Sequence, residues 1–143
     1  MTVTAILSSK GSEVVCIEPT ATLAAAARIL AERRIGSLVV LGAGGRISGI
    51  LSERDIVRSV GLRGAAALDE NVGQAMTRSV ATCTADDSIE SIMERMTNGK
   101  FRHMPVLTQN RLSGIVSIGD VVKDRLAAME QETEAMRDYI QSA

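Results

Sequence analysis

Apolar residues recur with helical spacing in two segments of the chain that lie about sixty-six positions apart. The first series is Leu23, Ala26, Ala27 and Leu30, and the second is Ile89, Ile92, Met93 and Met96. A spacing of i, i+3, i+4 and i+7 predicts one buried face of a helix. Thr22 and Ser88 stand just before these series, where a hydroxyl commonly caps the first turn. Each segment therefore predicts an N-capped amphipathic helix.

Short apolar runs of strand length surround both predicted helices. One run precedes each helix, and two follow it with a Gly- or Asn-bearing turn between them, which predicts a hairpin. The runs of the first copy are EVVCI, SLVVL and RISGIL, and those of the second are SVATC, HMPVL and RLSGIV. A further helix is predicted to begin near Glu53 and near Ile118. Each copy thus predicts the order β-α-β-β-α.

The two copies are an internal duplication. RISGILSERDIVR at 46–58 lies over RLSGIVSIGDVVK at 111–123, and seven of the thirteen positions are identical. We expect an α+β protein with a first repeat at 1–62, a linker at 63–78, a second repeat at 79–126 and a C-terminal helix extension at 127–143.

Composition narrows the class of protein. A chain of 143 residues with 45% hydrophobic residues can bury a core, and a net charge of −1 with a single Phe and a single Tyr argues against nucleic acid as a partner. The N-terminus does not resemble a secretory signal, and no apolar run is long enough to span a membrane. We therefore expect a soluble cytoplasmic protein. Cys16 and Cys83 belong to no metal-binding cluster and are predicted to be buried thiols.

The duplicated stretches GILSERD at 49–55 and GIVSIGD at 114–120 fall where a strand leads into a helix. Unpaired N–H groups and the helix dipole make such a junction suitable for phosphate. The two glycines permit close backbone approach, Ser52 and Ser117 can donate to phosphate, and Asp55 and Asp120 can accept hydrogen bonds from ribose hydroxyls. The same Ser-x-x-Asp spacing is also an ordinary capping arrangement.

The chain resembles a tandem pair of CBS domains, the regulatory modules named after cystathionine β-synthase. Both stretches fit the G-x-x-[ST]-x-x-D signature of that family, and the similarity covers nearly the whole chain. The resemblance implies two repeats packed through their sheets as one pseudo-twofold regulatory module of the stand-alone bacterial type. It further implies clefts for AMP, ADP, ATP, NAD(H) or S-adenosylmethionine, and frequent pairing of modules.

The resemblance also assigns roles to individual residues. Asp55 and Asp120 would hold ribose, and Ser52 and Ser117 would touch phosphate. Val15 and Ala81 match the position whose backbone reads the adenine edge. Arg102 and His103 match a basic pair that reaches the phosphates, although a lone histidine is often structural.

The copies differ where ligand would bind. Gly36 and Ser37 replace Arg102 and His103, and Arg54 replaces Gly119 and could add a charge of its own. The second copy is therefore the favoured nucleotide site, with either one nucleotide there or different ligands in the two clefts.

The last helix is predicted to run to the end of the chain, since no Pro and no further Gly follows Gly119. Its apolar stripe has coiled-coil spacing, with Thr133 at one position. The stripe could pack against its own module or against a second copy, and we expect a homodimer through the CBS helices.

The leading interpretation is a sensor in which an adenine nucleotide, acting as a regulatory ligand, signals energy or redox state to an unknown protein target. A structural interaction module with degenerate clefts is the alternative. No catalytic constellation or metal cluster stands out, so we expect no enzyme and no catalytic cofactor.

Overall fold

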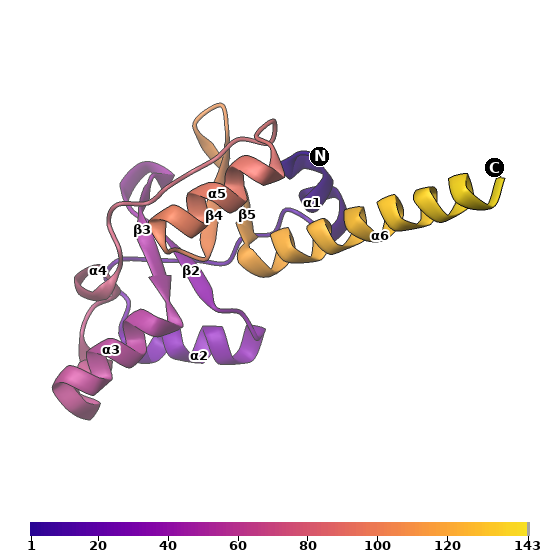
Figure 1. Cartoon of the computed structure of the whole chain (residues 1–143). Coiled ribbons are helices and arrows are strands. Elements are labelled where there is room, and N and C mark those ends of the chain that lie inside the picture. The colour runs from indigo at the N-terminus through magenta and orange to yellow at the C-terminus, as the bar shows by residue number, and fades with distance from the viewer. Residues whose placement is uncertain (143) are drawn as a thin grey trace.

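A three-stranded sheet and two helices form the first repeat in the computed structural model, which describes residues 1–142 (Figure 1). β2 and β3 make the predicted hairpin, and β1 pairs with β2 in parallel. The elements are β1 (Cys16–Ile17), α2 (Leu23–Arg33), β2 (Ser37–Leu41), a 3₁₀ turn η1 (Ala43–Gly45), β3 (Ile47–Ser52) and α3 (Glu53–Arg63).

The second repeat has the same order but a smaller sheet. It contains α5 (Ile89–Gly99), β4 (His103–Thr108), β5 (Arg111–Ser117) and α6 (Ile118–Ser142). Thr22 Oγ1 accepts from the Ala25 N–H and Ser88 Oγ accepts from the Ser91 N–H, both at 3.1 Å, so both predicted caps of α2 and α5 are confirmed.

The strand predicted at SVATC is reduced to one bridge between Cys83 and Val106. The Cys83 N–H donates to the Pro105 carbonyl, and the Leu107 N–H donates to the Cys83 carbonyl. The next bond of a parallel ladder would run from the backbone nitrogen of residue 105 to the Ala81 carbonyl, and proline carries no N–H. In the first repeat Val39 occupies that position and does donate to the Val15 carbonyl, at 3.2 Å.

Each repeat is completed by a short helix that precedes the other one. The helix α1 (Val3–Lys10), which the sequence reading missed, buries Val3 and Ile6 in the core of the second repeat. The helix α4 (Val72–Ala75), within the segment predicted to be a linker, buries Val72 in the core of the first repeat and follows the 3₁₀ segment η2 (Gly64–Asp69). The predicted domain boundaries remain a prediction, but side-chain packing crosses them.

Close packing of α1, and of the segment that follows α4, explains the glycine of each duplicated stretch. A Cβ on Gly49 would lie 2.5 Å from the Thr77 carbonyl oxygen, and a Cβ on Gly114 would lie 2.8 Å from Leu7 Cδ2. The close backbone approach expected at these glycines is therefore made by the protein's own chain.

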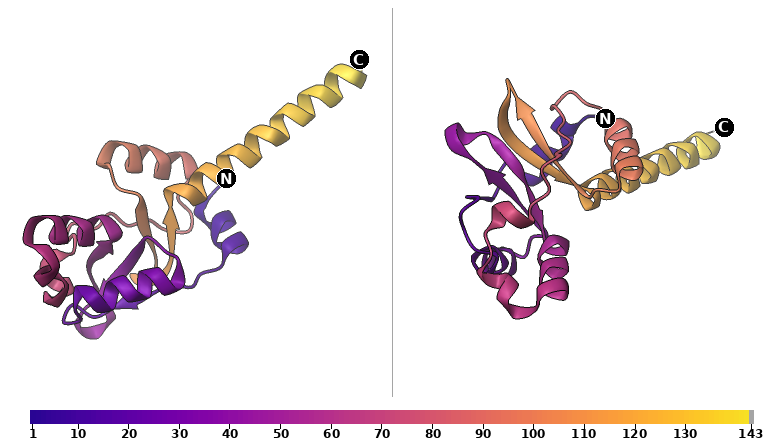
Figure 2. Two further views of the ribbon diagram at one scale, coloured as in Figure 1. Left: turned by 90° about the horizontal axis from the view of Figure 1, so that it is seen from below. Right: turned by 90° about the vertical axis from the view of Figure 1, so that its left-hand side faces the viewer.

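The predicted fold class is confirmed: the chain is an α+β pair of repeats with two small sheets and a long C-terminal helix. Both further views show α6 leaving the rest of the molecule (Figure 2). Val121 is the residue of α6 that is buried. Within residues 1–142, no helix is both long and apolar enough to cross a membrane.

Candidate functional site

The two strand-to-helix junctions have matching hydrogen bonds. The N–H groups of Glu53 and Ile118 donate to the carbonyls of Gly36 and Arg102, at 3.0 and 2.8 Å. One residue further into each helix, the N–H groups of Arg54 and Gly119 have no acceptor among residues 1–142. The first turn of each helix therefore keeps one unpaired N–H group rather than several.

Capping is present at both junctions, as one of the two interpretations of the motif expected. At the first, Ser52 Oγ accepts from the Asp55 N–H at 3.3 Å, and Asp55 Oδ2 accepts from the Ser52 N–H at 2.9 Å. Ser52 also donates its hydroxyl to Asp55 Oδ2, at 3.2 Å. Ser117 and Asp120 form the same two backbone bonds, at 3.1 and 2.9 Å.

The aspartates differ because one of them has a lysine partner. Lys10, the last residue of α1, places Nζ 2.7 Å from Asp120 Oδ2 and 3.0 Å from the Ile115 carbonyl oxygen. Partial burial favours a raised pKa for Asp120, but the bonds from Lys10 and Ser117 outweigh it and hold the pKa below its ordinary value. Asp55 is buried, and the cation within 4 Å of its carboxylate is Arg58, 3.9 Å from Oδ1.

A central cavity of about 540 Å³ lies between the two junctions. Seven of the nine predicted site residues line it: Ser52, Arg54, Asp55, Ala81, Arg102, His103 and Ser117. Val15 and Asp120 do not line this cavity. The structure thus brings Ala81 of the second repeat together with Asp55 of the first, whereas Asp120 faces Lys10.

The charge of the central cavity is mainly positive. Arg54, Arg58, Lys100 and Arg102 line it, against the carboxylates of Glu53 and Asp55. The available N–H groups of Arg54 and Gly119 belong to residues of the same lining. An anionic group would therefore find more donors and cations here than acceptors.

His103 reaches across to the first repeat. A Cβ placed on Gly36 would lie 3.6 Å from both Cε1 and Nε2 of His103, so Gly36 leaves room for the imidazole. Burial lowers the pKa of His103, and the cations Lys10 and Arg102 lower it further. Glu53 and Asp120 offset part of this effect. Because four charged groups influence the pKa of His103, a further charge placed nearby should change that pKa.

The backbone carbonyls of Val15 and Ala81 are not equivalent. The Val15 carbonyl accepts the Val39 N–H, whereas no donor among residues 1–142 reaches the Ala81 carbonyl, because Pro105 stands where its donor would be. A free backbone acceptor therefore belongs to a residue that lines the central cavity.

Sequence reasoning missed Lys10 at the second junction. A signal for it exists, because VTAILSSK at 3–10 can be laid over VGQAMTRS at 72–79. In that alignment Val3 matches Val72, both fully buried, and Lys10 matches Ser79, which lines the central cavity. The comparison would have placed Lys10 beside a junction.

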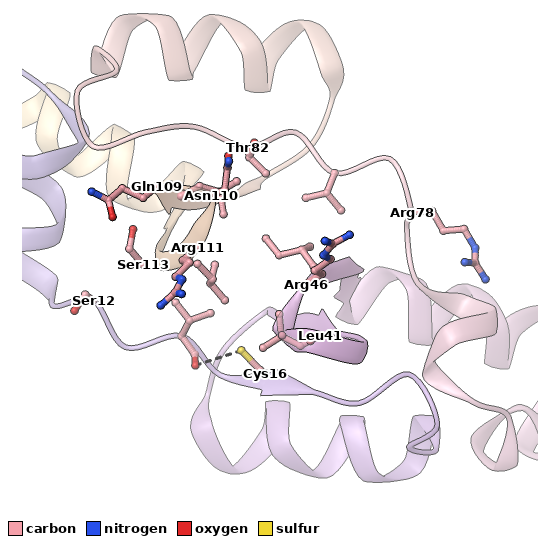
Figure 3. Close-up of a pocket in the computed structure, with 17 residues that line it drawn as sticks. Ser12, Cys16, Leu41, Arg46, Arg78, Thr82, Gln109, Asn110, Arg111 and Ser113 are labelled. Carbon is pink, nitrogen blue, oxygen red and sulfur yellow. Dashed lines mark hydrogen bonds between the residues drawn. The ribbon is translucent and has the colours of Figure 1, made fainter.

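A second, larger cavity lies at the hairpin ends and holds none of the predicted site residues (Figure 3). Its lining comes in equivalent pairs from the two repeats, such as Arg46 with Arg111 and Cys16 with Thr82. Cys16 is half-buried and Cys83 is buried, and burial raises the pKa of both thiols, that of Cys83 to about 11. No cluster of three or more His, Cys, Asp or Glu residues in the described chain could hold a metal ion.

Comparison with known proteins decides the family. The CBS domain model matches residues 5–61 and again 72–126. The chain is a tandem CBS-domain protein.

Related CBS proteins support this membership. The structure of a CBS-domain containing protein from Agrobacterium tumefaciens has a TM-score of 0.84 at 44% identity and covers 87% of this chain and 92% of that one. Hypoxic response protein 1 of Mycobacterium tuberculosis is 35% identical over 114 residues, 77% of each protein. A CBS domain protein from Pyrobaculum aerophilum, complexed with AMP, has a TM-score of 0.79 at 29% identity, covering 93% of this chain and 99% of that one. CBS pairs of this kind are non-catalytic regulatory modules, which confirms the expectation that the chain is not an enzyme.

Proposed function

We propose that this CBS pair is an adenine-nucleotide sensor whose ligand binds in the central cavity and regulates a partner protein. The observation that carries the proposal is the free Ala81 carbonyl, which lies in one cavity with four cations and two unpaired helix N–H groups. Such an acceptor suits the exocyclic amine of adenine, and the cations suit phosphate. The AMP complex of the relative from Pyrobaculum aerophilum supports the same ligand class.

Asp55 is the proposed ribose ligand. It lines the central cavity together with Ala81, whereas Asp120 is already bound by Lys10. We therefore favour a site shared by both repeats over the second junction, which the sequence favoured. Arg102, His103 and the Ser117 hydroxyl would then reach the phosphate from the second repeat.

The volume of the central cavity fits one ligand of nucleotide size, since small-molecule sites measure roughly 300 to 1,000 Å³. A ligand there would touch both repeats and would favour the packing between them that it fits best. This change in packing would alter a surface that a partner protein binds. The protein would thereby sense the concentration of an adenine nucleotide.

Isothermal titration with AMP, inosine monophosphate and adenosine tests this proposal. We expect AMP to bind most tightly. Inosine monophosphate lacks the amine that would donate a hydrogen bond to the Ala81 carbonyl, and adenosine lacks the phosphate. Asp55→Asn should weaken AMP binding about tenfold, the loss of roughly one charged hydrogen bond, and Asp120→Asn should weaken it less. Equal binding of all three ligands, or none by AMP, would contradict it.

A further inference from the structure

The protruding part of α6 carries an exposed apolar stripe with no partner among residues 1–142. Val122, Leu126, Met129, Met136, Tyr139 and Ile140 are each between 45% and 72% exposed. Of the two arrangements that the sequence left open, packing of this stripe against its own module is wrong, because the helix leaves the module (Figures 1 and 2). Apolar side chains at this density on one helix face normally belong to an interface.

The stripe follows a heptad repeat. Val122, Leu126, Met129, Thr133, Met136 and Ile140 are separated by four, three, four, three and four residues, which is the alternation of coiled-coil core positions. Thr133 donates its hydroxyl to the Met129 carbonyl at 3.0 Å, so the polar member of the core is satisfied within its own helix. The stripe can therefore pair with an identical stripe.

We propose that residues 122–140 of two copies of this chain form a parallel, in-register, two-stranded coiled coil. The charges that flank the core decide the partner and the direction. In the parallel arrangement Arg125 faces Glu130 of the second copy, and Glu132 faces its Arg137, so each flanking pair is attractive.

The antiparallel arrangement that covers the whole stripe sets like charges together. It would place Leu126 opposite Met136 of the second copy, which brings Glu130 against Glu130, Glu132 against Glu132, and Lys123 against Arg137. Opposed like charges at these positions destabilise an interface and so select against it. The dimer axis then runs along α6, and the central cavity of each copy stays outside the interface.

Light scattering at micromolar concentrations tests whether a second copy occupies the stripe. We expect twice the chain mass for the wild-type protein and a monomer for Met129→Glu combined with Met136→Glu. Ala127→Glu combined with Ala135→Glu adds the same charge at exposed positions outside the stripe and should remain a dimer. A monomeric wild type, or a dimer that survives the two methionine substitutions, would overturn the proposal. The second result would place the interface on other CBS helices.

Disulfide formation tests the direction of the helices. Thr133→Cys puts identical cysteines opposite each other only in the parallel, in-register coil, within the reach of a disulfide. We expect it to be cross-linked much faster than Gln131→Cys, whose side chain would point away from the partner, and faster than the wild type with its native thiols. Equal rates for the two variants would overturn the parallel arrangement.

Discussion

Lys10 Nζ lies 2.7 Å from Asp120 Oδ2 and joins the N-terminal helix α1 to the duplicated motif of the second repeat. The two groups are 110 positions apart in the chain and only partly exposed. The bond occupies one oxygen of an aspartate that otherwise matches Asp55. It therefore makes the two junctions of this CBS pair unequal in a way that their motifs do not.

Removing this ion pair should destabilise the fold. Lys10→Met keeps most of the side-chain volume, and we expect it to cost about 1 kcal/mol of unfolding free energy, measured by urea denaturation at pH 7. Because the pKa of Asp120 is lowered in the folded state, this contribution is present above the unfolded pKa and is lost as pH falls through the folded one. The difference from wild type should therefore shrink in strongly acidic buffer. Arg33→Met breaks the exposed pair with Glu13 and serves as the control, for which we expect no measurable change.

The glycines should respond to alanine substitution in a graded order. Gly49→Ala would set a Cβ against the Thr77 backbone and should cost about 2 kcal/mol, whereas Gly114→Ala meets the mobile end of Leu7 and should cost less. Gly61 lies inside α3 with nothing within 4 Å of its Cβ position, so Gly61→Ala should stabilise the protein by about 0.5 to 1 kcal/mol. Melting temperatures of the three variants check the order. A stabilising Gly49→Ala would show that the segment after α4 does not lie close against β3.

His103 should make stability depend on pH near neutrality. Its pKa is lowered by burial and by Lys10 and Arg102, against Glu53 and Asp120, so the unfolded state binds its proton more readily. Stability should accordingly fall as pH decreases through the ordinary histidine pKa of about 6.5. His103→Gln should flatten that part of the profile in denaturation at pH 5.5 and 7.5. A profile of the variant as steep as that of the wild type would assign the effect to other groups.

The local pattern of the chain is sufficient to predict most of this fold. Caps at Thr22 and Ser88, the helix periodicity and the two hairpins follow from neighbouring residues, and the structure confirms them. The helix α1 was missed because it is short and is held by Val3 and Ile6 in a core formed mainly by residues far along the chain. Such tertiary packing leaves little signal in local periodicity.

The candidate site, too, combines features that local sequence predicts with features that depend on tertiary packing. The motif located both junctions, and the differences between its two copies favoured the second junction as the nucleotide site. The structure adds two contacts that the motif does not indicate: α1 brings Lys10 to Asp120, and Ala81 lines the same cavity as Asp55. The effect of Pro105 on the Ala81 carbonyl depends on strand register, which the sequence alone did not specify.

Titration of AMP into the wild-type protein and into Pro105→Val tests the central claim most directly. Valine restores the backbone N–H that Val39 supplies in the first repeat, so the Ala81 carbonyl should gain an internal partner and the fold should be as stable as before or more so. We predict that AMP binds the wild type and that Pro105→Val weakens this binding about tenfold, the value of roughly one hydrogen bond. Unchanged affinity in a folded Pro105→Val, or no binding of AMP to the wild type, would contradict the account.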